Sequence, residues 1–438
     1  MSKPSNTSLH LTAQPVYLAA RALNNLICDL PSGTAYFIAI VLIPMFTGQL
    51  VQPQGSLARA ALPYVVHRRW GWHRVERAME RGHLSLDALF ERALTWCVEH
   101  LPVEPVRLGS ERRTVHAIDS STIARLRANK KKCALLGKGY CHRAKRAVSA
   151  NIVAALTTVV LVRGTRVGLV RRTRFGATCG EAVAEVFANL PASRDKRLLS
   201  VEAGIATQEQ FEAATEKAAL VGRLRKNVSL RRAPMPRRRG RRGRPPLHGP
   251  VRHPGAQRPE GHTDEDMLLM IEEREVRLRR WRNLHFKGAL QTLIDVVRVD
   301  DPAFKRPLLI GTTARELTTD EIRQAYGHRW PVETNFYGAQ GTGAMEMPRA
   351  WSEKAVERRL SLALLSGALL KALAAECAAL PMGPWDLKAV SSAGRLANYL
   401  DIHASNFAAL ALQSVAPRKY SKLREAKNTA DWRLPLAA

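Results

Sequence analysis

Residues 114–119 read TVHAID, a compact apolar run that ends in a carboxylate. A second apolar run, RLLSVEAG at 197–204, carries Glu202 near its end. Burying an ionised carboxylate costs free energy unless a metal ion, a cation or hydrogen bonds compensate for the lost water. The two runs therefore predict two core strands that each present an acidic side chain for chemistry.

Strand-like segments surround these two runs and alternate with helical ones. Residues 151–162 are β-rich and residues 165–175 alternate, whereas residues 181–190 have helical spacing. Further strands are expected at 220–228, 275–286, 293–299 and 307–313. Strands that alternate with helices predict an α/β sheet.

Both ends of the chain have a helical pattern. The N-terminal 105 residues or so contain short segments with helical spacing, and most of the chain after about residue 350 is helical. The N-terminal helices are consistent with a small DNA-binding unit or with a packing subdomain. The longest apolar run there, Tyr36 to Phe46, is too short for a membrane span of about 20 residues. It predicts a buried helix or strand, and no membrane partner is expected.

The composition indicates a globular protein with a polyanionic partner. The 438 residues include 68 Lys and Arg against 38 Asp and Glu, a net charge of +30. Hydrophobic residues make up 46% of the chain, enough for a large core in about two to four domains. Six scattered cysteines and no visible secretory leader favour a cytoplasmic protein with free, buried thiols.

The positive charge is concentrated in one segment. Thirteen basic residues and no acidic ones lie between Arg223 and Arg258, and the same segment is rich in Pro and Gly. Such a composition predicts a flexible or extended stretch. Within it, Arg242 and Arg244 belong to an Arg-Gly-Arg-Pro sequence that resembles an AT-hook, a motif that enters A·T minor grooves. The alternative is a linker that binds phosphates without sequence preference.

A second basic cluster follows Asp119. It contains Lys138, Arg143, Lys145 and Arg146. Such a cluster can line a DNA channel or simply form a solvated face. Its position directly after the first acidic run favours the channel.

A third carboxylate, Glu333, lies in YGHRWPVETNFYGAQ at 326–340. At ~100° per residue, Tyr326, Arg329, Glu333 and Gln340 fall within roughly 60° of one helical face. The proline at 331 should start or kink the helix, which would place Tyr326 and Arg329 on the preceding turn. Taken alone, Arg329 and Glu333 indicate an i,i+4 surface ion pair. Their Tyr, Trp and Pro context and the two acidic strand ends favour a metal site instead.

Together, the two acidic runs and the Tyr-x2-Arg-x3-Glu spacing resemble the DDE transposases of bacterial insertion sequences. The resemblance is closest to the family with a Tyr-Arg-Glu-Lys signature, and it covers roughly residues 110 to 350. It implies a ribonuclease H-like mixed sheet in which the first and fourth strands are neighbours. It also implies a β-rich, basic insertion before the last carboxylate, and 131 positions separate Glu202 from Glu333.

The resemblance also implies roles for individual residues. Asp119, Glu202 and Glu333 would be the catalytic ligands of two Mg²⁺ ions, for which Mn²⁺ can substitute. Tyr326 and Arg329 would contact the DNA backbone beside the scissile phosphate. The implied partners are double-stranded DNA, as terminal repeats and as target, and a second copy of the chain. The implied location is the nucleoid of a bacterial cytoplasm.

Two positions depart from the family pattern. The family has Asp where this chain has Glu202, and a Glu side chain is longer by roughly 1.5 Å. It has Lys where this chain has Gln340, whose amide cannot neutralise a phosphate. The departures leave two hypotheses: a transposase with weakened or lost activity, and a noncatalytic DNA-binding descendant. An RNA-binding protein is a third, less favoured by the aromatic content of 6%.

Four regions are expected along the chain. Residues 1–108 form a helical region, and residues 109–228 with 307–348 form the catalytic domain. Residues 229–306 form the basic linker and β-rich insertion, and residues 349–438 form a C-terminal helical region. Trp330, next to Arg329, is expected in the packed core, with stacking on a flipped base as the alternative.

Overall fold

The structure is a computed structural model of the chain. It describes residues 6–61, 63, 72–108, 111–125, 133, 135–141, 144–190, 196–215, 217–234, 246–256, 262–380, 386 and 390–413. Within these ranges, no helix is long and apolar enough to cross a membrane.

The chain divides into two compact units, Met1–His100 with Gly338–Ala438, and Leu101–Tyr337. The finer division into four regions stays a prediction. The first unit is helical. Its helices are α1 (Asn6–Ile27), α2 (Ser32–Phe46), α3 (Leu57–Ala61), α4 (Trp72–Arg81), α5 (Leu86–His100), α10 (Glu353–Glu376), α11 (Ala393–Ile402) and α12 (Ala404–Leu412).

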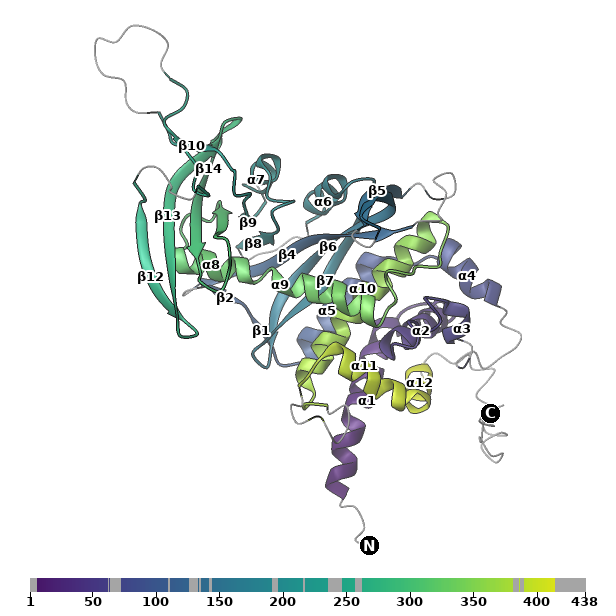
Figure 1. Ribbon diagram of the computed structural model, residues 1–438. Helices are drawn as coiled ribbons and strands as arrows, with labels where there is room; N and C mark the ends of the chain where they lie inside the picture. The colour runs from purple at the N-terminus through teal and green to yellow at the C-terminus, as the bar shows by residue number, and fades with distance from the viewer. Residues whose placement is uncertain are drawn as a thin grey trace, which may run out of the picture. The chain divides into compact units, whose positions relative to one another are not determined.

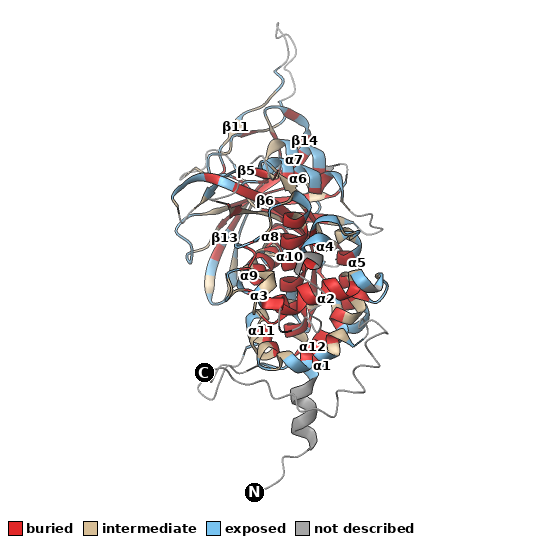
Figure 2. Ribbon diagram, turned by 90° about the vertical axis from the view of Figure 1, so that its right-hand side faces the viewer, coloured by how far each residue is buried: buried red, intermediate tan, exposed pale blue. Residues whose placement is uncertain are grey.

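Two helices, α2 and α10, supply much of the core of the helical unit (Figure 2). Every residue from Tyr36 to Phe46 is buried, so the apolar run expected as a helix or strand is a helix covered on all sides. Arg358 of α10 donates to the backbone carbonyls of Ala78 and Met79, at 2.8 Å each. These bonds tie α10 to carbonyl groups in the last turn of α4, where a cationic side chain is favoured.

The second unit is built on a mixed sheet. Among the described residues its strands are β1 (Val103–Pro105), β2 (Arg107–Leu108), β3 (Glu111–Arg112), β4 (Thr114–Ala124), β5 (Leu136–Cys141), β6 (Arg146–Val162), β7 (Thr165–Gly176), β8 (Arg197–Val201), β9 (Ala219–Arg223), β10 (Leu230–Arg231), β11 (Val251–Arg252), β12 (Glu265–Ile271), β13 (Arg274–Phe286), β14 (Ala289–Asp300) and β15 (Leu308–Thr312). Its helices are α6 (Cys179–Ala188), α7 (Gln208–Thr215), α8 (Thr319–Gly327) and most of α9 (Trp330–Gly341).

One large sheet runs through this unit in the order β1-β6-β4-β8-β9-β15-β14-β13-β10-β11, with β7 and β5 on β6 and β12 outside β13 (Figure 1). The strands β4, β8 and β9 are parallel, and the other pairs are antiparallel. The predicted mixed α/β sheet is therefore confirmed. The strand expected at 220–228 is shorter, because β9 ends at Arg223.

The two faces of the sheet are covered by different helices. Alternate residues of a strand point to opposite faces. Leu199 and Val201 of β8 belong to the core that α6 and α7 complete, whereas Ser200 between them donates to the carbonyl of Tyr326 in α8 at 3.3 Å. Asn335 of α9 likewise donates to the carbonyl of Gly168 in β7 at 3.0 Å. The helices α8 and α9 thus lie on the face opposite α6 and α7.

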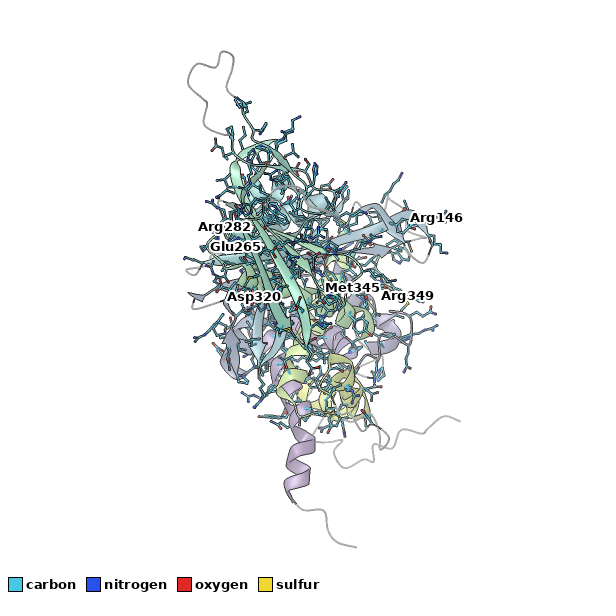
Figure 3. All side chains as sticks on the ribbon, turned by 60° about the vertical axis from the view of Figure 1, so that its left-hand side comes forward. Arg146, Glu265, Arg282, Asp320, Met345 and Arg349 are labelled. Carbon is cyan, nitrogen blue, oxygen red and sulfur yellow. The ribbon has the colours of Figure 1, made fainter. Side chains whose placement is uncertain are left out.

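Arginine–carboxylate pairs join the strands β12, β13 and β14. Arg280 of β13 has no exposed surface and donates to Asp295 of β14 and to the carbonyl of Leu317 at 2.8 Å. Nearer the surface, Arg282 and Glu265 lie side by side on β13 and β12 (Figure 3). A buried guanidinium is tolerated only when its donors are satisfied. These carboxylates therefore have a structural role, and they partly neutralise the arginines beside them.

Candidate functional site: three carboxylates around Arg329

Strand register brings the first two acids together. In the parallel pair β4–β8, Ile118 is aligned with Val201. The next positions are Asp119 and Glu202, and neighbouring strands lie ~4.8 Å apart. The sequence suggests that the strand ends at Asp119. In the structure β4 continues to Ala124 in its pairing with β6. Glu202 follows the last residue of β8.

The third acid arrives on helices that cross the same face. The helix α8 begins with the predicted capping box, in which Thr318 and Glu321 satisfy each other's backbone amides. It ends at Gly327, and α9 starts at Trp330 with a proline in its first turn. As predicted from that proline, the helix is interrupted. Tyr326 therefore lies on α8, Arg329 in the turn and Glu333 in the first turn of α9.

The guanidinium of Arg329 lies at the centre of the three acids. Its Nη1 atom contacts Oδ2 of Asp119 at 3.4 Å and also bonds to Oε1 of Glu333. Its Nε atom lies 3.2 Å from Oε2 of Glu202, although it is not aligned for a hydrogen bond. One cation thus touches carboxylates from three elements of the sheet unit.

Glu202 has further partners besides Arg329. The Tyr326 hydroxyl donates to its Oε2 at 3.0 Å, and Nη1 of Arg223 lies 3.2 Å from its Oε1. Arg223 is the last residue of β9, the strand next to β8. The ring of Tyr326 also lies 5.6 Å from the guanidinium carbon of Arg329. Glu202 is therefore held by a hydroxyl and two arginines.

The electrostatics of the cluster follow from its partial burial. Burial raises the pKa of Asp119 to about 6, and the nearby Glu333 and Glu202 add to the rise, against the opposing effects of the Ser120 amide and Arg329. Burial likewise raises the pKa of Tyr326 to about 12, so its hydroxyl remains a donor near neutral pH. Burial alone would lower the pKa of Arg329, but Tyr326, Glu333 and Glu202 outweigh it and raise the pKa. Arg329 therefore stays charged.

The donor set suits a hard divalent cation. Carboxylate oxygens are the ligands that Mg²⁺ and Mn²⁺ prefer, and two-metal sites hold their ions about 4 Å apart. Within the described ranges, no group of three or more His, Cys, Asp or Glu residues is arranged as a ready metal site. The three acids instead converge on a guanidinium, which stands where a cation would bind. The three carboxylates have the donor chemistry that divalent ions require, provided that the Arg329 guanidinium moves away from them.

Other predicted site residues lie elsewhere. Gln340 is half-buried, two turns beyond Glu333 on α9. Lys138, Lys145 and Arg146 are exposed on the β5–β6 hairpin, and Arg146 lies at its outer end (Figure 3). Three predicted DNA-binding residues are outside the described residues: Arg143, Arg242 and Arg244.

Two side chains near the site, Trp330 and Arg223, and two cysteines elsewhere in the chain differ from expectation. Trp330 is 60% exposed, so the expected core position is wrong. The sequence indicates Arg223 only as one basic residue of the linker, whereas in the structure it pairs with Glu202. The only signal in the sequence is that Arg223 lies in the strand expected at 220–228. Two of the cysteines expected to be buried, Cys28 and Cys179, are exposed; all six are free.

No protein-family model matches the chain, and no curated protein sequence matches it.

Proposed function

We propose that the protein is a metal-dependent DNA-cleaving and strand-transferring enzyme of the DDE transposase type. The observation that carries the proposal is the convergence of Asp119, Glu202 and Glu333 on one cation. These residues are separated by up to 214 positions in the chain. Three acids gathered on one face of a sheet destabilise the fold unless a cation neutralises them, and such an arrangement is expected at a functional site.

The sheet order supports a ribonuclease H-like arrangement. If β4, β6, β7 and β8 are counted as the first four strands, the first and fourth are paired and parallel, as the resemblance implies. The strands β10 to β15 lie between Glu202 and Glu333 in the chain and extend the same sheet. This placement agrees with a β-rich insertion before the last carboxylate.

The basic surface supports DNA as the partner. The β5–β6 hairpin presents exposed Lys138 and Arg146, and β5 is linked to the end of β4, the strand that carries Asp119. The exposed indole of Trp330 adjoins Arg329 and offers a face for a base. We take duplex DNA ends and target DNA as substrates, and a homodimer as the assembly that holds two ends.

In this proposal Asp119, Glu202 and Glu333 would hold two Mg²⁺ ions. Such ions lower the pKa of a bound water and stabilise the attacking and leaving oxygens of a phosphoryl transfer. Arg329 and the Tyr326 hydroxyl donate hydrogen bonds, so they can orient a backbone phosphate beside the acids. Arg223 keeps one oxygen of Glu202 engaged.

The test is nicking of labelled duplexes taken from the DNA that flanks the coding sequence, with Mg²⁺ or Mn²⁺. We expect metal-dependent nicks that Asp119→Ala abolishes by at least about a hundredfold, since carboxylate ligands act as a unit. The matched control is Asp320→Ala, which removes an acid paired with Arg323 on α8, away from the three acids. Nicking that survives Asp119→Ala would refute the site assignment.

A second variant separates the two hypotheses about activity. If the native protein binds DNA without nicking but Glu202→Asp nicks, the longer side chain has inactivated an enzyme. Salt-dependent DNA binding with no nicking by either protein would support the noncatalytic descendant instead.

A further inference from the structure

Arg329 and a divalent cation would compete for the same oxygens. The guanidinium touches Asp119, Glu202 and Glu333 at once, and its side chain is only 10% exposed. A Mg²⁺ or Mn²⁺ ion bound to these oxygens would lie against a positive charge in a partly dry environment, where repulsion is strong. The carboxylates therefore cannot hold metal ions while Arg329 keeps its present contacts.

The contacts of Arg329 are of a kind that can be exchanged. Its Nε atom has no aligned acceptor, and its contact with Asp119 is long at 3.4 Å. The residue lies in the two-residue turn between α8 and α9, not within a helix. Only its bond to Glu333 is close. A phosphate that accepts two parallel hydrogen bonds from the guanidinium would replace that one bond together with one long and one misaligned contact.

We propose that Arg329 is an exchangeable counter-ion that couples DNA binding to metal binding. Without DNA it neutralises the three acids and excludes divalent ions. When a backbone phosphate takes its guanidinium, the acids lose their cation and bind metal ions in its place. DNA and metal ions then bind cooperatively, and the DNA-free protein does not accumulate with metal ions bound. The inference rests on the proposed function and adds the order of binding.

The coupling can be measured without catalysis. Mn²⁺ binding is followed by electron paramagnetic resonance of the free ion, first for the DNA-free protein. We expect Arg329→Gln to bind Mn²⁺ at least about tenfold more tightly than the native protein, because a positive charge beside the ligands is removed. Arg223→Gln is the matched control, since it removes an arginine that contacts Glu202 alone. It should change the Mn²⁺ affinity less than about threefold.

The native protein provides a second measurement that does not depend on a stable variant. With a saturating DNA duplex, its Mn²⁺ affinity should rise at least tenfold, after subtraction of the Asp119→Asn complex to remove ions held by DNA. By reciprocity, Mn²⁺ should tighten DNA binding by the same factor. Equal Mn²⁺ affinity with and without DNA would overturn the coupling. If Asp119→Asn and Glu333→Gln leave the Mn²⁺ binding of Arg329→Gln intact, the metal site itself is wrong and the proposed function fails with it.

Discussion

An ionised carboxylate at Asp119 destabilises the fold, although the proposed metal site needs this ionised form. The Asp119 carboxyl group is partly buried beside two further acids, and burial raises its pKa from 3.8 to about 6. The native state therefore holds this proton more tightly than the unfolded chain does. As the pH rises from about 4 to about 6, the carboxyl group ionises in an unfavourable place, and stability is lost.

We expect Asp119→Asn to be more stable than the native protein at pH 7, in the absence of metal ions and DNA. The gain should be on the order of 1–3 kcal/mol in the free energy of unfolding, because the amide carries no charge. The difference should disappear below about pH 4, where Asp119 of the unsubstituted protein is protonated in both the folded and the unfolded state. Urea unfolding at the two pH values measures it, and equal stability at pH 7 would contradict the assigned pKa.

Buried histidines add a pH dependence of the opposite sign. Burial, with Arg171 and Arg197, lowers the pKa of His116 to about 3, and its Nδ1 atom lies 3.1 Å from the hydroxyl of Thr158. The unfolded chain therefore takes up this proton first, and the contribution of neutral His116 is lost as the pH falls below about 6.5. His116 is a core residue on the face of β4 opposite Asp119. Stability measurements on Asp119 variants thus need the native protein at the same pH as reference.

At the scale of elements, the α8–α9 junction decides where Arg329 and Glu333 lie. The capping box fixes the start of α8, and the proline in the first turn fixes the start of α9. Glu333 then stands in the first turn, where the helix dipole favours a negative charge. The junction thus presents an acid and a guanidinium from adjacent but independent elements.

Loss of the capping box should loosen α8 and with it the turn. We expect Thr318→Ala to cost about 1 kcal/mol, because the side-chain acceptor for the Glu321 amide is lost. Hydrogen exchange of the α8 amides reports the change locally, and urea unfolding reports it globally. Glu321→Gln keeps a side chain that can complete the box, so it should cost clearly less; an equal loss would show that the box is not what orders the helix.

At the scale of the whole molecule, the charge is unevenly used. On β12 and β13, arginines pair with carboxylates, as Arg277 does with Asp266. On the β5–β6 hairpin, Lys138 and Arg146 are exposed basic residues near the strand that carries Asp119. The net charge of +30 is therefore a poorer guide to the proposed DNA-binding surface than the positions of the exposed basic residues.

Removing charge from the hairpin should weaken DNA binding more than removing it from β13. For a variant with Lys138→Gln and Arg146→Gln, the slope of log affinity against log salt should fall by up to about 2. Fluorescence anisotropy with a labelled duplex measures the slope. The matched control, Arg274→Gln with Arg277→Gln, removes the same charge from arginines that are paired with acids. Equal changes in the two variants would contradict a specific role for the hairpin.

The sequence by itself determined the locally encoded features. Apolar runs predicted β4, β6, β7, β8, β13, β14 and β15, and Thr318 with Glu321 predicted the start of α8. The proline after Trp330 predicted the break before α9, and the spacing of acids singled out Asp119, Glu202 and Glu333. These signals are readable because periodicity, caps and prolines act within a few residues.

Only the tertiary structure decided how these residues meet. The alignment of Ile118 with Val201 joins strands about 80 positions apart, and no local pattern specifies it. The same holds for the pairing of Arg223 with Glu202 and for the exposure of Trp330. Above all, the convergence of three acids on Arg329 depends on two helices crossing one face of the sheet. Contacts between distant elements arise from packing of whole surfaces, so the charge balance of a site is fixed only when the fold is complete.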